Sequence, residues 1–162
     1  MPSPEASAAP TPATAPPSTF RHSIRVRYVE CDPMRVAHHS SCIAWLEEAR
    51  TEMLRGSGVS YAQLEAAGVF LVVASLEVGY RRPIRYDDVI AIEVEASAMG
   101  RARLRHDYRL VLLERDGAAP DAQSDPSVPL DGVCVRATTV LACVGADGRP
   151  RPMPGWLAGA EA

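Results

Sequence analysis

A carboxylate and two histidines stand close together in the sequence, just before a segment with helical periodicity. Asp32 is followed by the adjoining pair His38 and His39, and the apolar pattern of a helix begins at about Ser41. The first turn of a helix has free backbone N–H groups and the positive end of the helix dipole. A base and donors for an anionic oxygen would therefore lie together, which is what acyl transfer from a carbonyl compound requires.

Each of these side chains has a structural explanation as well as a chemical one. Asp32 precedes a proline, and an aspartate in that position commonly begins a turn. As a catalytic group it would activate water as a general base or attack the carbonyl directly, and both routes stay open. His39 would orient water, donate to the carbonyl or assist the leaving group, because an unperturbed imidazole titrates at about pH 6.5. Otherwise it is a polar residue at a helix start.

The histidine pair and the cysteines do not predict a metal site. Neighbouring side chains on a helix point apart, and no third ligand is spaced to join His38 and His39. The four cysteines lack the C-x-x-C spacing of structural zinc, and we expect them to be reduced thiols.

The composition predicts one domain and no nucleic-acid partner. A chain of 162 residues is long enough for a single core. Its 17 basic residues are all arginines and its net charge is −3, so there is no excess of cations suited to nucleic acid. The longest apolar run, residues 69–74, is far shorter than the roughly 20 residues of a membrane span. Residues 1–19 are rich in Ala, Pro, Ser and Thr and lack the features of a signal peptide, which predicts a disordered leader and a cytoplasmic location.

The elements that would position the Asp32 region follow from the hydrophobic periodicity. Residues 20–30 alternate as a half-buried strand, a long helix runs from about Ser41 to Gly56, and Ser60 with Gln63 is typical of the capping box of a short second helix. Four further strands are predicted in residues 69–78, 90–96, 104–112 and 133–141, with a long mobile loop at 116–132. Their short connections favour antiparallel pairing. One helix face buried against about five strands predicts a two-layer α+β domain.

Ordered matches to a known family extend over residues 21–154. They are Tyr28, Asp32, His39, the helix run at 45–52, the segments 58–61 and 80–88, and Gly148-Arg149-Pro150. Together they resemble the hotdog-fold acyl-CoA thioesterases of the 4-hydroxybenzoyl-CoA thioesterase type, especially the branch associated with the Tol-Pal envelope system. The resemblance implies a hotdog domain at residues 20–154, an antiparallel sheet wrapped around one long central helix, followed by a short tail at 155–162.

The resemblance also implies an activity, an assembly and a set of site residues. The activity is hydrolysis of an acyl-CoA thioester without a cofactor, with Asp32, His39 and Tyr28 as catalytic residues. For Tyr28, ordinary strand packing is the alternative. The assembly is a homodimer, or a tetramer of dimers, with sheets joined edge to edge and active sites at the interface. An open sheet edge favours pairing with a second copy on physical grounds alone.

Two positions depart from the family pattern, and both fall where the resemblance places the substrate pocket. Arg35 stands where glycine is usual, and Cys42 where tyrosine is frequent. His38 is expected to line the same pocket, and the backbone around His38 to Ser40 to supply oxyanion donors.

A basic cluster downstream is the candidate site for the phosphates of coenzyme A. It consists of Arg81, Arg82 and Arg85, and arginine is suited to bidentate phosphate binding. A solvated strand edge beside Asp87 and Asp88 is an equally ordinary explanation.

Two other functions also stay open: a dehydratase or hydratase of acyl thioesters on the same fold, and a non-catalytic acyl-thioester-binding subunit. The sequence specifies neither the acyl group nor the choice between coenzyme A and acyl carrier protein.

Overall fold

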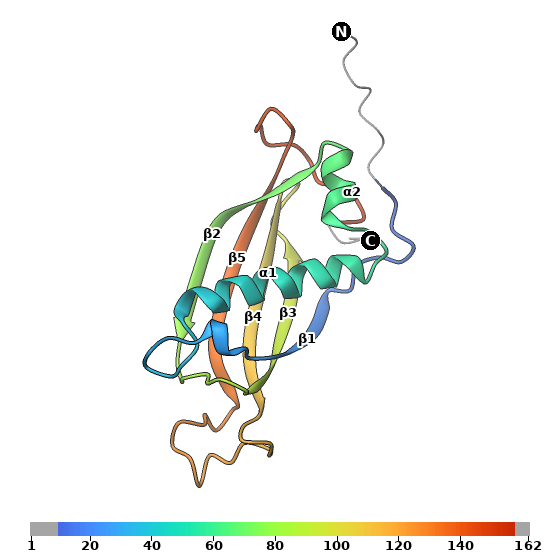
Figure 1. Ribbon diagram of the computed structural model, residues 1–162. Coiled ribbons are helices and arrows are strands. Elements are labelled where there is room, and N and C mark those ends of the chain that lie inside the picture. Colours follow the sequence, from blue (N-terminus) through green and yellow to red (C-terminus); the bar gives the residue numbers. More distant parts are fainter. Residues whose placement is uncertain (1–9, 158–162) are drawn as a thin grey trace.

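The computed structural model describes residues 10–157, which form a curved antiparallel sheet with one long helix against one face (Figure 1). The strands are β1 (Thr19–Arg25), β2 (Phe70–Tyr80), β3 (Val89–Ala98), β4 (Arg103–Glu114) and β5 (Val133–Val144). The long helix is α1 (His39–Arg55), accompanied by α2 (Tyr61–Ala66) and a short 3-10 turn, η1 (Tyr28–Glu30). The predicted α+β class and hotdog arrangement are confirmed.

The sheet order places the first two strands of the chain at its two edges. The order is β1-β3-β4-β5-β2, and every neighbouring pair is antiparallel. Tyr108, on the central strand β4, pairs with Val94 on β3 and Ala137 on β5. The register of β2 on β5 shifts between Val73 and Ser75, which is a β-bulge. Because β2 is the last strand in this order, it has one partner strand, β5, and one free edge.

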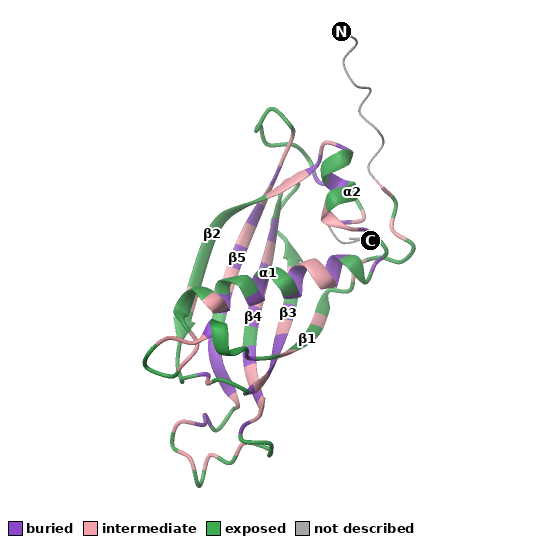
Figure 2. Cartoon of the chain, in the orientation of Figure 1, coloured by how far each residue is buried: buried purple, intermediate pink, exposed green. Residues whose placement is uncertain are grey.

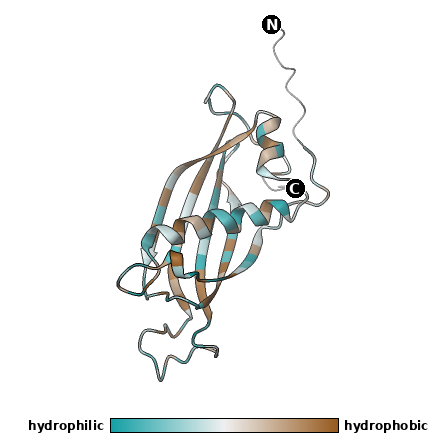
Figure 3. Ribbon diagram, viewed as in Figure 1, coloured by the Kyte–Doolittle hydropathy of each residue, from teal (hydrophilic) through white to brown (hydrophobic). Residues whose placement is uncertain are grey.

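One face of α1 supplies the centre of the core. Trp45, Leu46, Ala49 and Met53 recur at helical spacing and are buried. They pack against alternating residues of β3, β4 and β5, so the buried positions lie on the strands beneath the helix (Figure 2). The same positions form the apolar bands along the strands in Figure 3. The opposite side of α1 is exposed for much of its length (Figure 2).

Both helices form in the segments where the sequence predicts them. α1 begins at His39, two residues before the predicted start, with His38 as its N-cap, and Gly56 is its C-cap. Ser60 caps α2 and forms the expected capping box with Gln63. These local hydrogen bonds were readable from the sequence because all their partners lie within one turn.

The first strand is shorter than predicted. β1 ends at Arg25, and the chain then turns through η1 instead of continuing to residue 30. Glu30 accepts hydrogen bonds from the Arg27 amide (2.7 Å) and from the indole N–H of Trp45 (2.9 Å), and these bonds close the turn. As a result Tyr28, which the alternation placed on the inner face, is 80% exposed.

The termini and the long loop also contact the domain. Residues 1–9 of the predicted leader and 158–162 of the predicted tail lie outside the described residues. In the remainder, the Ala13 amide donates to the Ser57 carbonyl, and Trp156 and Leu157 pack against the core. The loop between β4 and β5 has no helix or strand, but its buried Val128 anchors it to the core. No helix within residues 10–157 is long and apolar enough to cross a bilayer.

Candidate active site

Asp32 begins a tight turn that leads into α1. Its carbonyl accepts from the Arg35 amide (2.9 Å), its amide donates to the Val36 carbonyl (3.0 Å), and its Oδ1 accepts from the Met34 amide (2.8 Å). The turn role considered from the sequence is therefore real. It occupies one carboxylate oxygen, and Oδ2 has no hydrogen-bond partner in residues 10–157. The half-buried side chain thus has one oxygen for the turn and one that is free for chemistry.

The backbone conformation at residue 35 explains why glycine is usual at this position. Arg35 has φ of 64°, in the left-handed region that favours glycine. A side chain there costs about 1 kcal/mol. The Arg35 side chain is exposed and has no ion pair in the described part of the chain. The turn conformation is therefore kept, and a free cation is added beside Asp32.

The first turn of α1 offers one uncommitted donor and one weakly used donor. The amide of His39 donates to no acceptor in residues 10–157, and the amide of Ser40 makes only a long contact of 3.4 Å to Nδ1 of His38. The amide of His38 is not available, because it donates to the Glu30 carbonyl at 2.8 Å. Of the three predicted oxyanion donors, two remain: His39 and Ser40.

The two histidine rings are exposed and lie against each other at the start of α1. Their centroids are 4.0 Å apart with an interplanar angle of 42°. Nδ1 of His38 is 2.7 Å from the Ser40 hydroxyl, so His38 acts as the helix cap. The hydroxyl of Tyr80, at the end of β2, donates to the His39 carbonyl at 2.9 Å. Tyr80 thus ties the helix start to the sheet edge.

A pocket of about 280 Å³ lies beside this helix start. It is lined by Val36 and Ala37 of the Asp32 turn, by Cys42 of α1, by Val135, and by the segment 80–84 that includes Tyr80 and Arg82. Asp32 and His39 are on the turn and helix end that flank the pocket, and they do not line it in the single chain. Burial raises the pKa of the Cys42 thiol to about 12, so Cys42 stays protonated and serves as an apolar wall.

The basic cluster divides into committed and free arginines. Arg81 donates to Asp131 (2.8 Å), and Arg85 donates to Ser127 (3.0 Å) and lies 3.5 Å from Asp125. The Arg82 guanidinium bonds only the neighbouring Arg81 carbonyl and has no carboxylate partner within the described chain. Arg82 is therefore the cluster member best able to meet a phosphate.

A buried ion pair, which the sequence did not reveal, holds the pocket wall. Arg115 makes a bidentate contact with Asp88, at 3.0 and 2.7 Å, and both side chains are almost fully buried. Arg115 also donates to the Pro83 carbonyl at 3.0 Å and to the Ser127 hydroxyl at 2.8 Å. These bonds fix the segment from Pro83 to Asp88 and the long loop together. No sequence signal connects Arg115 to Asp88, because the contact joins a strand end to a distant turn.

Glu30 is the second residue that sequence reasoning missed. It joins η1 to α1 through the bonds to Arg27 and Trp45, and it is 8% exposed. Burial opposes its ionisation, but the hydrogen bonds from Arg27 and Trp45 outweigh burial and hold the pKa of Glu30 below its usual value. A charged Glu30 therefore fixes the turn that precedes Asp32. The spacing of Arg27 and Glu30 was a local signal of this turn.

Tyr28 is not brought to the pocket. Its ring makes an edge contact with Tyr86, with centroids 5.6 Å apart at an angle of 84°. Both rings are largely exposed, on the surface of η1 and of the turn before β3. The tyrosine that touches the helix start is Tyr80.

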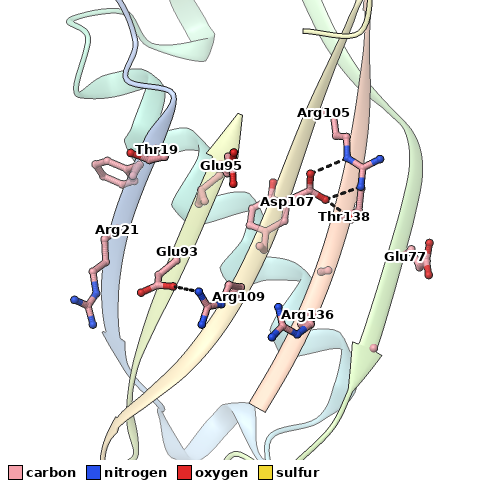
Figure 4. Close-up of a pocket in the computed structure, with 15 residues that line it drawn as sticks. Thr19, Arg21, Glu77, Glu93, Glu95, Arg105, Asp107, Arg109, Arg136 and Thr138 are labelled. Atoms are coloured by element: carbon pink, nitrogen blue, oxygen red, sulfur yellow. Dashed lines mark hydrogen bonds and ion pairs between the residues drawn. The ribbon is translucent and has the colours of Figure 1, made fainter. Parts of the chain in front are cut away.

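A larger hollow lies on the other face of the sheet and contains none of the predicted site residues (Figure 4). It measures about 970 Å³ and is a broad surface crossed by two ion pairs, Arg105 with Asp107 (2.7 Å) and Arg109 with Glu93 (3.6 Å). Arg21, Glu77 and Glu95 also border it and have no ion pair within residues 10–157. In residues 10–157 there is also no group of three or more His, Cys, Asp or Glu side chains arranged to hold a metal ion.

Comparison with known proteins places this chain among thioesterase-like proteins. The profile of the Thioesterase-like superfamily matches residues 26–160. The chain is 39% identical over 95 residues to the acyl-CoA thioester hydrolase YbgC of Escherichia coli O6:H1, an alignment that covers 59% of this chain and 71% of that protein. It is 28% identical over 116 residues to a putative esterase of Aquifex aeolicus, which covers 72% of this chain and 89% of the relative.

Solved structures share the fold. A probable thioesterase from Bartonella henselae superposes with a TM-score of 0.69 at 23% identity, covering 84% of this chain and 99% of that one. A 1,4-dihydroxy-2-naphthoyl-CoA thioesterase from Synechocystis superposes with a TM-score of 0.73 at 15% identity, covering 89% and 98%. At such identities the superpositions establish the fold alone.

Proposed function

Because this chain belongs to the Thioesterase-like superfamily, we propose that it is an acyl-CoA thioesterase that releases a free acid and coenzyme A. The observation that carries the proposal is the pairing of groups at the start of α1. Asp32 has a free carboxylate oxygen, and the His39 amide that follows the same turn has no acceptor in residues 10–157. A base or nucleophile and an oxyanion donor are both present there.

Hydrolysis at this site has two balanced routes. In one, Asp32 takes a proton from water while the water oxygen attacks the thioester carbon, the C–S bond breaks, and the thiolate leaves and is protonated. In the other, Asp32 attacks the carbon itself, the thiolate leaves from the resulting adduct, and water then cleaves the anhydride. In both, the carbonyl oxygen becomes anionic, and one backbone donor from His39 or Ser40 contributes about 3 kcal/mol. The His39 ring, exposed at the same helix start, is placed to orient water or to protonate the thiolate.

Substrate binding is assigned to the groups that remain free around the pocket. Arg82 and Arg35 would meet the phosphates of coenzyme A, and Arg85 is a weaker candidate because Ser127 and Asp125 already occupy it. The acyl group would enter the pocket along Cys42, with His38 at its rim. Tyr28, which is exposed, would act only through contact with substrate or a second subunit beyond the single chain.

A homodimer through the free edge of β2 would complete the site. β2 is exposed along most of its length (Figure 2), and Val72, Val73 and Leu76 are exposed apolar residues on it. A long apolar edge strand is open to pairing with a second copy. Because Tyr80 of β2 bonds the first residue of α1, a copy paired at this edge would also cover the Asp32 turn. A tetramer of such dimers is the larger assembly consistent with the proposal.

Light scattering of a Val73→Arg variant tests the assembly. We expect the wild type to be at least a dimer and Val73→Arg to be shifted towards monomer with reduced thioesterase activity. A monomeric wild type with full activity would overturn the dimer.

The four unpaired cysteines are in keeping with a reducing cytoplasm, and that location stays a prediction.

A panel of acyl-CoA substrates tests the function itself. Release of free thiol should be detected with a thiol reagent for at least one acyl class, with the free acid as the second product. An enoyl-CoA that gains water while its thioester stays intact would favour the hydratase alternative. Tight acyl-CoA binding with no thiol released from any substrate would favour the non-catalytic subunit.

A further inference from the structure

A second enclosed space lies at the other end of α1. It has a volume of about 110 Å³ and is bordered by α1, α2 and the inner faces of β3 and β4, with residues 16–18 and 156–157 at its mouth. Arg50 is eleven residues beyond His39, which places this cavity roughly 16 Å along the helix from the Asp32 turn. The densely packed Trp45, Leu46 and Ala49 lie between the two sites. The cavity is therefore separate from the hydrolytic pocket.

One side of the cavity is polar although it is enclosed. The Arg50 guanidinium is only 9% exposed, donates to the Tyr61 hydroxyl at 2.6 Å and lies 5.2 Å from the centre of that ring. Its carboxylate neighbour, Glu47, is 3.4 Å away and mostly solvent-exposed. Arginine has five N–H donors, so several are left without a protein acceptor in residues 10–157. Tyr61 accepts from Arg50, and its own proton has no acceptor there.

His106 borders the same space, and one nitrogen of its buried ring is orphaned. The side chain is 4% exposed, and its Nδ1 has no hydrogen-bond partner in the described chain. Buried polar atoms without partners are rare and costly in proteins. Burial, together with the nearby Arg50 charge, lowers the pKa of His106 to about 4, so the ring is neutral at pH 7 and one nitrogen can donate. Three polar groups with spare hydrogen-bonding capacity thus border one cavity.

The remaining walls are apolar. Met53, Leu54, Leu71, Leu104 and Trp156 surround the polar side. A cavity of about 150 Å³ with apolar walls is known to hold benzene, so this cavity of about 110 Å³ suits a body smaller than benzene. A cation, a hydroxyl donor and a neutral imidazole beside such walls suit a carboxylate with a small apolar body.

We propose that this cavity is a second ligand site, which binds a compact apolar monocarboxylate with its carboxylate held by Arg50 and Tyr61 beside the His106 ring. The carboxylate supplies the acceptors that Arg50 and Tyr61 lack, and the apolar body fills the space towards Leu104 and Trp156. Binding here does not depend on thioester hydrolysis.

Calorimetric titration of the full chain with sodium propionate tests the site, with 1-propanol as the neutral probe of the same carbon chain. We expect propionate to bind more tightly than the alcohol, and Tyr61→Phe and His106→Phe each to weaken propionate about tenfold, the size of one hydrogen bond to a charged group. Tyr86→Phe, the same change at an exposed ring, should leave the affinity unchanged. Amide NMR shifts on propionate addition should centre on Leu71 and Leu104, away from Val36 and Cys42.

Asp32→Asn separates this proposal from the hydrolytic one. It should bind propionate as the wild type does, while Tyr61→Phe and His106→Phe should still release thiol from acyl-CoA. Loss of propionate binding in Asp32→Asn would place the ligand in the hydrolytic pocket and overturn the proposal. So would unchanged affinity in both Tyr61→Phe and His106→Phe, or no binding to the wild type at millimolar propionate, which would leave water as the only occupant of the cavity.

Discussion

The polar groups at the two ends of α1 differ in how far they are exposed to solvent. At the N-terminal end, the free oxygen of Asp32 and the His39 amide lie on a turn that is open beside the β2 edge. At the C-terminal end, Arg50 and His106 are enclosed by the sheet, α2 and both tails. In the proposed reaction, the first end exposes its polar groups to a substrate that must enter and leave. The second buries groups that cost stability unless a ligand satisfies them.

The difference follows from what surrounds each end of the helix. The N-terminal end sits over the edge strand β2, where the protein provides no further layer (Figure 1). The C-terminal end sits inside a second apolar cluster that includes Leu64, Leu141 and Leu157. The N-terminal end of α1 is therefore open because it lies at the edge of the sheet. The C-terminal end is enclosed because other segments of the chain pack over it.

The largest expected effect on stability comes from removing the Asp88–Arg115 ion pair, which holds the pocket wall at the N-terminal end of α1. Asp88→Ala removes the buried, bidentate partner of Arg115 and leaves only the more exposed Asp125, 3.2 Å away, to balance its charge, which should lower the free energy of unfolding by about 3 kcal/mol. Urea unfolding measures it. Asp87→Asn, next along the chain but paired with Arg25 at the surface, should leave the unfolding midpoint nearly unchanged. Equal stability of Asp88→Ala and wild type would show that the pocket wall does not depend on this pair.

The enclosed end should make stability depend on pH. His106 has a pKa of about 4 in the fold, lowered by burial and Arg50 and opposed by Asp107, whereas an unfolded histidine titrates at about 6.5. The unfolded chain therefore binds the proton first, so stability is lost as pH falls below the unfolded value. Between pH 8 and pH 5 the loss should be about 2 kcal/mol. Urea unfolding of His106→Phe at both pH values should lack this part of the loss, and an identical pH dependence would contradict it.

Charge at the open end should affect binding of coenzyme A more than chemistry. Arg82→Met should raise KM for an acyl-CoA about tenfold with little change in kcat, because one phosphate contact is lost. The same variant should be unaffected with the matching acyl-N-acetylcysteamine thioester, which has no phosphates. Arg149→Met, a fully solvated arginine at the turn after β5, is the control. An equal KM change for both substrates would remove Arg82 from phosphate binding.

The smallest effect concerns the backbone of the Asp32 turn. Arg35→Gly should raise stability by about 0.5–1 kcal/mol, because glycine adopts the positive φ without strain. Arg35→Ala loses the same charge but keeps the unfavourable conformation, and should show no gain. Thermal unfolding of the pair compares them directly. If alanine and glycine are equally stable, the left-handed turn is not the reason that glycine is usual at this position.

Local signals in the sequence sufficed for much of the fold. Ser60 with Gln63, and the apolar spacing that ends at Gly56, predicted both helices because the partners are a few residues apart. Asp32 was proposed from its position before the long helix and from the family resemblance. Its free oxygen was not, because that depends on which atom the Met34 amide takes.

Contacts between distant elements were beyond the sequence. The bond from Trp45 to Glu30 turned the chain out of β1 and moved Tyr28 to the surface. The pairing of Arg115 with Asp88 and the enclosure of His106 depend on which strands lie side by side. Nothing in the spacing of these residues shows that the sheet brings them together.

The most direct measurement of the central claim is the single-turnover rate of acyl-CoA already bound to Asp32→Asn, with Asp116→Asn as the matched exchange at an exposed turn. If Asp32 drives attack on the thioester, the rate should fall about 100- to 10,000-fold in Asp32→Asn while the affinity for acyl-CoA is kept, and Asp116→Asn should behave as the wild type. A bound thioester that is hydrolysed at the wild-type rate by Asp32→Asn would contradict the account.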